Sequence, residues 1–202
     1  MLTWLRFNNS LFLANQNTPM LTPNFTPFPV LTTDRLVLRR MTRDDIHELF
    51  RLRSDKRVNH YLIRAPYQSV EDANAFITKT DTAIPNNEFI IWGITLKDEN
   101  KVIGTICIWN LKREHDRAEV GYELYPDYWR KGIMQEALTA ILDYGFNTMK
   151  LHSIAAIIDP FNQGSYSLLE KNHFVKEAHF KEDYFHDGKF KDTVIYSLLS
   201  PK

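Results

Sequence analysis

The segment DRAEVGYELYPDYWRKGIMQEAL, residues 116–138, combines the patterns of a strand, a turn and the start of a helix. Apolar and carboxylate residues nearly alternate over residues 118–124, which is typical of a half-buried strand. Pro126 marks a turn, and a helix opens at Lys131-Gly132, after which apolar residues recur with a period of about 3.6. The first amides of a helix have no partner within it, and the helix dipole adds partial positive charge there. The segment therefore predicts a phosphate-binding site.

The composition is that of a single ordinary globular domain of 202 residues. Lys and Arg together number 25, as do Asp and Glu, so the net charge gives no reason to expect nucleic acid or an anionic membrane as a partner. No apolar run approaches the roughly 20 residues that span a bilayer. The single cysteine, Cys107, fits a reducing cytoplasm and lies in an apolar strand pattern, which favours a packing role over a nucleophilic one.

The first thirty residues differ from the rest. Met20 begins the same MLT tripeptide as Met1, and residues 1–19 lack the cleavage site of a signal peptide. Two interpretations stay open: a loosely held extension, or a start placed too early. We expect residues 1–30 to be an N-terminal extension and residues 31–200 to form the domain.

The remaining patterns predict an α/β (α+β) fold, with a mixed, mostly antiparallel sheet of about seven strands and helices on both faces. Thr42 and Ser69 are expected N-caps, and Asp45 completes a capping box with Thr42. Asp187-Gly188 marks the turn of a long terminal hairpin. The expected order is a strand (33–41), two helices (42–55, 70–81), three strands (88–97, 101–112, 118–124), a helix from 131, a strand (152–159), a helix (162–172) and the hairpin (174–200).

Together with this order, the stretches LYPDYWRKGIM, DPFNQGS and LLEKNHF resemble the GCN5-related N-acetyltransferase (GNAT) superfamily. Within it, LTTDRLVLRRMTRDD, AEVGYEL and YWRKGIMQEAL are similar to the RimJ/RimL branch, which acetylates the N-terminal alanine or serine of ribosomal proteins. The resemblance covers about residues 31–199. It implies a GNAT fold and an enzyme that moves an acetyl group from acetyl-CoA to a primary amine. No metal is expected, because the histidines show no ligand spacing.

The resemblance also implies where acetyl-CoA would bind. The family's signature, Q/R-x-x-G-x-G/A, lies over residues 129–134, where Gly132 matches the first glycine but Trp129 and Met134 depart from the pattern. The pyrophosphate would contact the backbone of this loop, and the pantetheine arm would pair with the preceding strand like an added β-strand. Asn162 would bond the pantetheine as well as cap its helix. The expected donor-binding residues are Tyr122, Glu123, Leu124, Trp129, Arg130, Lys131, Gly132, Ile133, Met134, Asn162 and Ser165.

Amide formation from a thioester needs a neutral amine, a polarised carbonyl and a protonated leaving thiolate. Glu119 is the first candidate for the general base, because other members of the superfamily hold a glutamate there, and Glu123 is the second. Many members protonate the thiolate with a tyrosine, but Leu169 occupies that position, so Ser165 is the expected donor, with Tyr166 a poorer candidate.

The backbone N–H of Leu124 would polarise the carbonyl. Direct attack by the amine is expected rather than an acyl-enzyme on Cys107, because the sequence places no histidine to activate that thiol.

The acceptor is less well defined by the sequence. The leading prediction is a protein N-terminal α-amine, and the alternatives are a small amine (polyamine, amino acid or aminoglycoside) or a non-catalytic CoA-binding module. The acceptor groove is expected between the first two helices and the terminal hairpin, whose first strand and turn offer Glu182, Asp183, Tyr184, His186 and Asp187. A monomer and a homodimer are equally compatible with the sequence.

Overall fold

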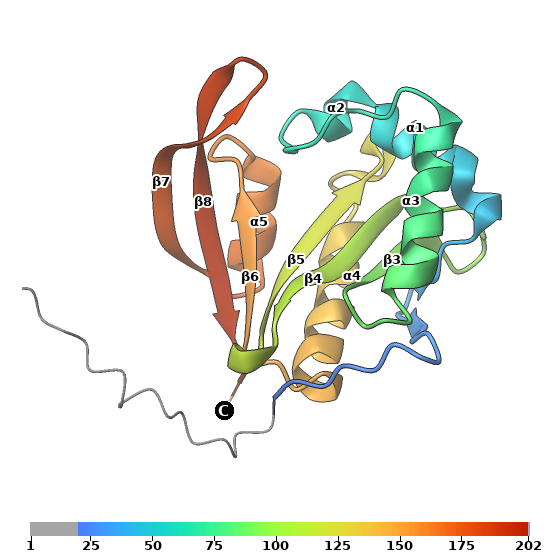
Figure 1. The fold of residues 1–202 in the computed structure, drawn as a ribbon, viewed down its shortest axis with the longest axis horizontal. Coiled ribbons are helices and arrows are strands. Elements are labelled where there is room, and N and C mark those ends of the chain that lie inside the picture. Colours follow the sequence, from blue (N-terminus) through green and yellow to red (C-terminus); the bar gives the residue numbers. More distant parts are fainter. Residues whose placement is uncertain (1–19, 202) are drawn as a thin grey trace, which may run out of the picture.

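Residues 20–201 are described by a computed structural model, and they form one eight-stranded sheet with helices on both faces (Figure 1). The strand order is β1-β2-β3-β4-β5-β6-β8-β7, and every neighbouring pair is antiparallel except β5 and β6. The mixed, mostly antiparallel sheet expected from the sequence is therefore confirmed. The eighth strand is β1, Leu31–Thr32, whose two residues are too few to show a pattern.

The other strands are β2 (Leu36–Arg39), β3 (Ile90–Leu96), β4 (Gly104–Lys112), β5 (Arg117–Leu124), β6 (Ser153–Ile158), β7 (Val175–His186) and β8 (Lys189–Leu199). The helices are α1 (Ile46–Ser54), α2 (Lys56–Asn59), α3 (Val70–Ala83), α4 (Ile133–Asp143) and α5 (Gln163–Lys171). None of the helices within residues 20–201 is long and apolar enough to cross a membrane.

The segment before residue 31 packs on the domain where it is described. Leu21 and Phe25 are buried in the core, and the backbone N–H of Leu21 donates to the carbonyl of Arg113. The backbone N–H of Phe25 donates to the side chain of Asn87. Residues 1–19 of the expected extension lie outside the described residues, and the domain boundary at residue 31 stays a prediction.

Both expected helix caps are present. Thr42 and Asp45 form a capping box, but the first turn, Arg43–Asp45, is a 3-10 turn, and α1 begins only at Ile46. Ser69 and Asp72 form the second capping box, at the start of α3. α1 and α3 pack on each other over one face of the sheet, beside β3 (Figure 1).

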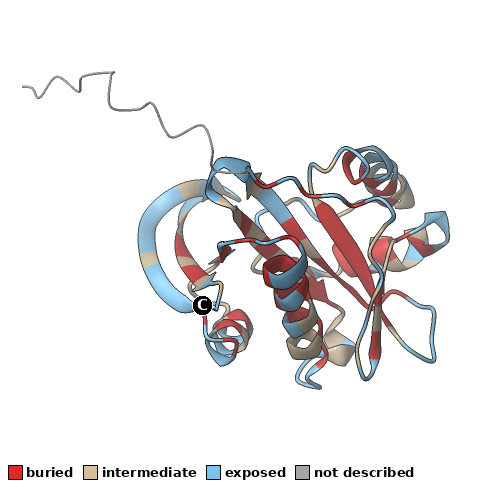
Figure 2. Cartoon of the chain, turned by 90° about the horizontal axis from the view of Figure 1, so that it is seen from below, coloured by how far each residue is buried: buried red, intermediate tan, exposed pale blue. Residues whose placement is uncertain are grey.

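The apolar stripe of α4 covers the opposite face, against β2 and β4. Its buried members include Ala137, Leu138 and Ile141, as the 3.6-residue period predicts. On β2, Leu36 and Leu38 are both fully buried, as their alternation predicts. Figure 2 shows the buried residues gathered in the sheet and on the helix faces that contact it.

The central strands β5 and β6 separate partway along their length. They pair in parallel only where Arg117–Glu119 lies beside Ser153–Ala155. β5 then continues to Leu124 along β4, while β6 continues to Ile158 along β8 (Figure 1). We call this separation the fork. It leaves one edge of β5 without a strand partner directly before the predicted phosphate site.

Candidate active site

The strand register decides which backbone groups of β5 face the fork. The N–H of Tyr125 donates to the carbonyl of Ile103, so the odd-numbered residues of β5 point their backbone toward β4. Because successive residues of a strand alternate in direction, Tyr122 and Leu124 present theirs to the fork. The backbone of Glu123 points toward β4 instead, which argues against the expected backbone contact of Glu123 with pantetheine.

Trp129 occupies the signature position where the family has Gln or Arg. Its indole Nε1 donates to the carbonyl of Leu124 at 2.7 Å, so the last carbonyl of β5 is already satisfied. The departure from the signature therefore has a local structural role. At the fork, no partner within residues 20–201 takes up the N–H of Leu124 or the two backbone groups of Tyr122, so these groups can bind a ligand.

The loop between β5 and α4 turns through two left-handed residues, Arg130 (φ 58°) and Gly132 (φ 74°). Glycine adopts this conformation without the steric cost that a Cβ brings. Gly132 is also the N-cap of α4, and no side chain in the described part of the chain caps that helix end. The first N–H groups of α4, including those of Ile133 and Met134, are thus available to an anion, as a phosphate site requires.

A clamp not expected from the sequence holds this loop. The carboxylate of Glu136, in the first turn of α4, accepts from Thr33 Oγ1 (2.5 Å), from the backbone N–H of Arg35 (2.8 Å) and from Arg35 Nε (2.6 Å). Arg35 also donates to the carbonyl of Lys131 at 3.0 Å. Burial acts to raise the pKa of Glu136, but these bonds lower it on balance. The partners lie about one hundred residues apart, so no local pattern signals the clamp.

Glu119 and Glu123 lie on the same face of β5 but have different surroundings. Glu119 is half-buried, and its carboxylate accepts from Asn110 Nδ2 at 2.6 Å. No cation among residues 20–201 forms a salt bridge with it. This geometry suits the proton-accepting role expected of Glu119.

Glu123 is only 7% exposed and is fully engaged. Its carboxylate is bound by Arg53 Nε at 2.7 Å, by Arg64 and by Thr105 Oγ1 at 2.9 Å. Burial acts to raise its pKa, but attraction to Arg53 and Arg64 outweighs burial and holds the pKa at about 2. Such a carboxylate is a poor base at neutral pH, so the geometry argues against this second candidate.

Asn162 and Ser165 lie together at the start of α5. The side-chain oxygen of Asn162 accepts from the backbone N–H of Ser165 at 3.1 Å, so the predicted cap is present. No described residue accepts a hydrogen bond from Asn162 Nδ2, so that amide can still donate to a ligand. Ser165 is buried, with 8% of its surface exposed.

The tyrosine beside Ser165 comes from β5. The hydroxyl of Tyr122 is buried and makes no hydrogen bond with any described residue. Burial raises its pKa to about 12, and the neighbouring Ser165 hydroxyl only partly offsets this. Strand alternation places Tyr122 on the face opposite Glu119, which the sequence could have indicated. Leu169 is fully buried, and Tyr166 packs edge-on against Tyr196, with ring centroids 5.6 Å apart.

Cys107 has the packing role expected of it. Its Sγ would lie 3.2 Å from a Cβ added at Gly121, so the thiol packs against the backbone of β5. Burial raises the pKa of this thiol to about 12, which leaves little thiolate at neutral pH. Within residues 20–201, no group of three or more His, Cys, Asp or Glu side chains could hold a metal ion.

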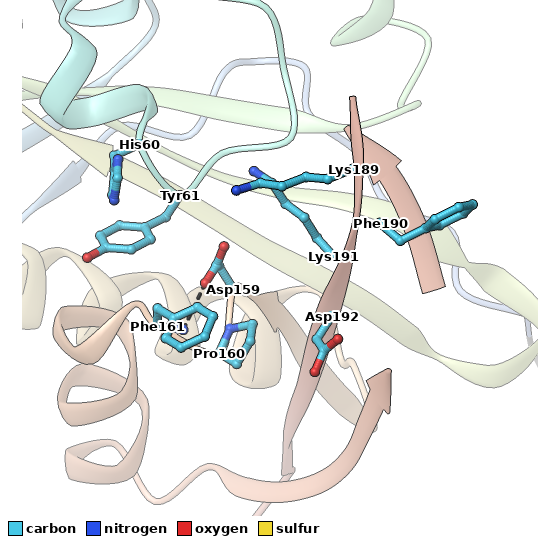
Figure 3. Close-up of a pocket in the computed structure, with 9 residues that line it drawn as sticks. All are labelled: His60, Tyr61, Asp159, Pro160, Phe161, Lys189, Phe190, Lys191 and Asp192. Carbon is cyan, nitrogen blue, oxygen red and sulfur yellow. Dashed lines mark hydrogen bonds between the residues drawn. The ribbon is translucent and has the colours of Figure 1, made fainter. Parts of the chain in front are cut away.

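A cavity of about 380 Å³ lies beside the end of β6 (Figure 3). It is bounded by the segment after α2, by the turn that leads into α5, and by the terminal hairpin, close to where the acceptor groove was expected. The hairpin strand that lines it is β8, and none of the expected residues Glu182, Asp183, Tyr184, His186 and Asp187 does so. The lining residues are His60, Tyr61, Asp159, Pro160, Phe161, Lys189, Phe190, Lys191 and Asp192.

The reason lies in the sheet order: β8, not β7, pairs with β6, so the second hairpin strand is nearer the fork.

Comparison with known proteins gives a consistent result. A family profile described as "Acetyltransferase (GNAT) domain" matches residues 35–175. The chain is 35% identical over 175 residues to the uncharacterized N-acetyltransferase YoaA of Bacillus subtilis, covering 87% of this chain and 99% of that protein. It is 32% identical over 180 residues to the [ribosomal protein uS5]-alanine N-acetyltransferase of Escherichia coli, covering 85% and 91%.

Among solved structures, the chain is similar to the spermidine N-acetyltransferase of Vibrio cholerae in complex with CoA and spermine. The TM-score is 0.74 at 24% identity, and the match covers 83% of this chain and 97% of that one. At this level of identity the likeness concerns the fold.

Proposed function

Because this chain belongs to the GNAT family and is an acetyl-CoA-dependent N-acetyltransferase, we propose that its acceptor is the N-terminal α-amine of a protein, of the ribosomal-protein type. The observation that carries the proposal is the environment of Glu119, whose only hydrogen-bond donor among the described side chains is Asn110. An α-amine has a pKa of about 8, so about a tenth of it is already neutral at pH 7. It therefore needs only modest help from a carboxylate such as Glu119.

A lysine-like or polyamine nitrogen, with a pKa of about 10.4, is neutral to less than about one part in a thousand at pH 7. A small-amine acceptor is therefore the second candidate. The similarity over most of the chain to an alanine N-acetyltransferase also supports the α-amine.

The donor fits the unpaired groups of the fork. Tyr122 and Leu124 offer backbone groups to a pantetheine arm, and Asn162 offers an amide N–H. The start of α4, with its left-handed Gly132 and the flanking Arg130 and Lys131, suits a pyrophosphate. Acetyl-CoA supplies the activated acetyl thioester.

In the proposed reaction the amine attacks the acetyl carbonyl directly. Glu119 accepts the amine proton, directly or through water, and the N–H of Leu124 donates to the carbonyl oxygen as negative charge develops there. The C–N bond forms as the C–S bond breaks. The hydroxyl of Ser165 donates a hydrogen bond to the departing sulfur, and the neighbouring Tyr122 hydroxyl would orient it by donating to the Ser165 oxygen. The proton that the CoA thiolate takes up is balanced by the proton that the amine releases to Glu119.

The test measures thiol release from acetyl-CoA with three kinds of acceptor: peptides with free Ala or Ser N-termini, spermidine, and aminoglycosides. We expect kcat/KM to be highest for the peptides. Turnover restricted to spermidine or aminoglycosides would refute the protein acceptor. Ser165→Ala should lower kcat while the Kd for CoA changes little; an equal loss of both would show that Ser165 serves binding.

A further inference from the structure

Two lysines of β8 point into the cavity beside the fork. Lys189 and Lys191 are two residues apart, so strand alternation puts both on one face of β8. Figure 3 shows both side chains reaching toward Tyr61 and Asp159. Neither lysine forms a salt bridge with another residue in the range 20–201. Their charges are thus uncompensated by close partners.

The acidic residues of the cavity do not neutralise them. Asp192 lies on the other face of β8, where its carboxylate accepts from the backbone N–H of Glu182 (2.9 Å) and binds His179 Nε2 (2.7 Å). The bond from Glu182, followed by that with His179, lowers the pKa of Asp192. The Asp192 carboxylate is therefore already paired and does not neutralise the lysines. Among the described lining residues, Asp159 is the remaining carboxylate that faces the lysines, and its Oδ1 already accepts from the N–H of Phe161 at 2.8 Å.

The position of the cavity links it to the reaction. Asp159 and Phe161 belong to the turn directly before Asn162 and Ser165, which lie at the start of α5. An acceptor whose amine is held near Ser165 would therefore bring its following residues close to the lysines. Lys191 is half-buried, so solvent screens its charge less than at an open surface.

We propose that this cavity selects acceptors that carry a negative charge close to the amine, such as peptides with Asp or Glu directly after the N-terminal residue. The inference rests on the proposed function, because it assigns the amine to a peptide. Two lysines against one engaged carboxylate attract an acidic side chain and repel a polyamine, which carries positive charge along its whole length.

The experiment uses three matched peptides with the sequence Ala-X, where X is Asp, Asn or Lys, followed by one common neutral sequence. Thiol release gives kcat/KM for each peptide with the wild-type enzyme. We expect Asp to be preferred over Lys by about tenfold or more at low ionic strength, and the ratio to shrink in about 0.5 M salt.

The variant Lys189→Glu/Lys191→Glu should reverse the order of the Asp and Lys peptides. The matched control is Lys176→Glu/Lys181→Glu, which makes the same charge change on exposed positions of β7 that do not line the cavity. The control should keep the wild-type order of the peptides, because it leaves the cavity lysines in place. An effect of overall charge, in contrast, would change the order equally in both variants.

Each outcome has one meaning. Equal kcat/KM for the three peptides, with good turnover, would overturn the charge selection and leave the proposed function standing. An equal change in both double variants would overturn it too, by assigning the preference to overall charge. Turnover of spermidine without turnover of any peptide would instead refute the proposed function.

Discussion

Replacing Glu123 with glutamine separates its structural role from catalysis. The carboxylate is buried between Arg53, Arg64 and Thr105, and Glu123→Gln keeps the shape but removes the charge. Arg53 would then be a buried cation without its partner, since its own side chain is only 8% exposed. Breaking a buried ion pair from one side costs about 3–5 kcal/mol.

The pKa of Glu123 gives a second value for the stability that is lost with its charge. Folding lowers the pKa of Glu123 from 4.5 to about 2, and at about 1.4 kcal/mol per unit the ionised carboxylate stabilises the fold by about 3 kcal/mol. Because the folded pKa is the lower one, this contribution is fully present above the unfolded pKa. It disappears as the pH falls from about 4.5 to about 2.

The assay is urea unfolding at pH values from 7 down to 3, with thiol release measured on the folded protein at pH 7. Glu123→Gln should lower the free energy of unfolding at pH 7 by about 3 kcal/mol and flatten its decline in acid. Turnover per folded molecule should be retained, because a carboxylate with a pKa of about 2 is a poor base at neutral pH.

Glu119→Gln is the matched control, since it makes the same change on the same face of β5. It should lower turnover about 100-fold or more and change stability by less than about 0.5 kcal/mol. The reasoning would be refuted if Glu123→Gln unfolded at the wild-type urea concentration but lost its turnover, because Glu123 would then be the base.

Three further predictions concern the donor site. Gly132→Ala places a Cβ at a left-handed position, which costs about 1–2 kcal/mol; the free loop should relax to escape this strain, so calorimetry should find CoA bound roughly five- to thirty-fold more weakly, and unchanged affinity would mean that the loop keeps its conformation and loses stability instead. Glu136→Ala removes the acceptor for Thr33 and Arg35, so urea unfolding should show a free energy of unfolding lower by about 1–3 kcal/mol. An unchanged free energy of unfolding would mean that water replaces the carboxylate. Tyr122→Phe removes a buried hydroxyl that no described residue bonds, so stability should hold while kcat falls; a parallel fall of both would argue for a packing role.

Features set by neighbours three or four residues away were predictable from the sequence. The capping boxes at Thr42 and Ser69 and the cap at Asn162 depend on such short-range bonds. The glycine-opened helix and the alternation of β5 are equally local, and they indicated both the candidate phosphate site and the face that carries Glu119. Similar patterns recur wherever the chain forms these elements, because the geometry of a turn or strand is the same in every fold.

Contacts between distant segments were not predictable. Alternation puts Glu119 and Glu123 on one face, yet the arginines that distinguish them lie 70 and 59 residues from Glu123. The clamp on the α4 loop joins Arg35 to a residue 101 positions away. The hairpin was recognised from its turn, but its pattern does not reveal which of its strands pairs with β6. Because β8 pairs with β6, Lys189 and Lys191 line the cavity instead of the acidic residues of β7.

The fork also couples folding to the supply of donor. In the proposed binding mode, the pantetheine pairs with backbone groups of Tyr122 and Leu124 that no described strand satisfies. The bound donor therefore extends the sheet as an additional strand would. A ligand that binds only the folded chain stabilises it by about 2.7 kcal/mol at a hundred times its Kd. The melting temperature of this protein would therefore rise with the concentration of free acetyl-CoA. The stability of the fold would then depend on how much acetyl donor is present.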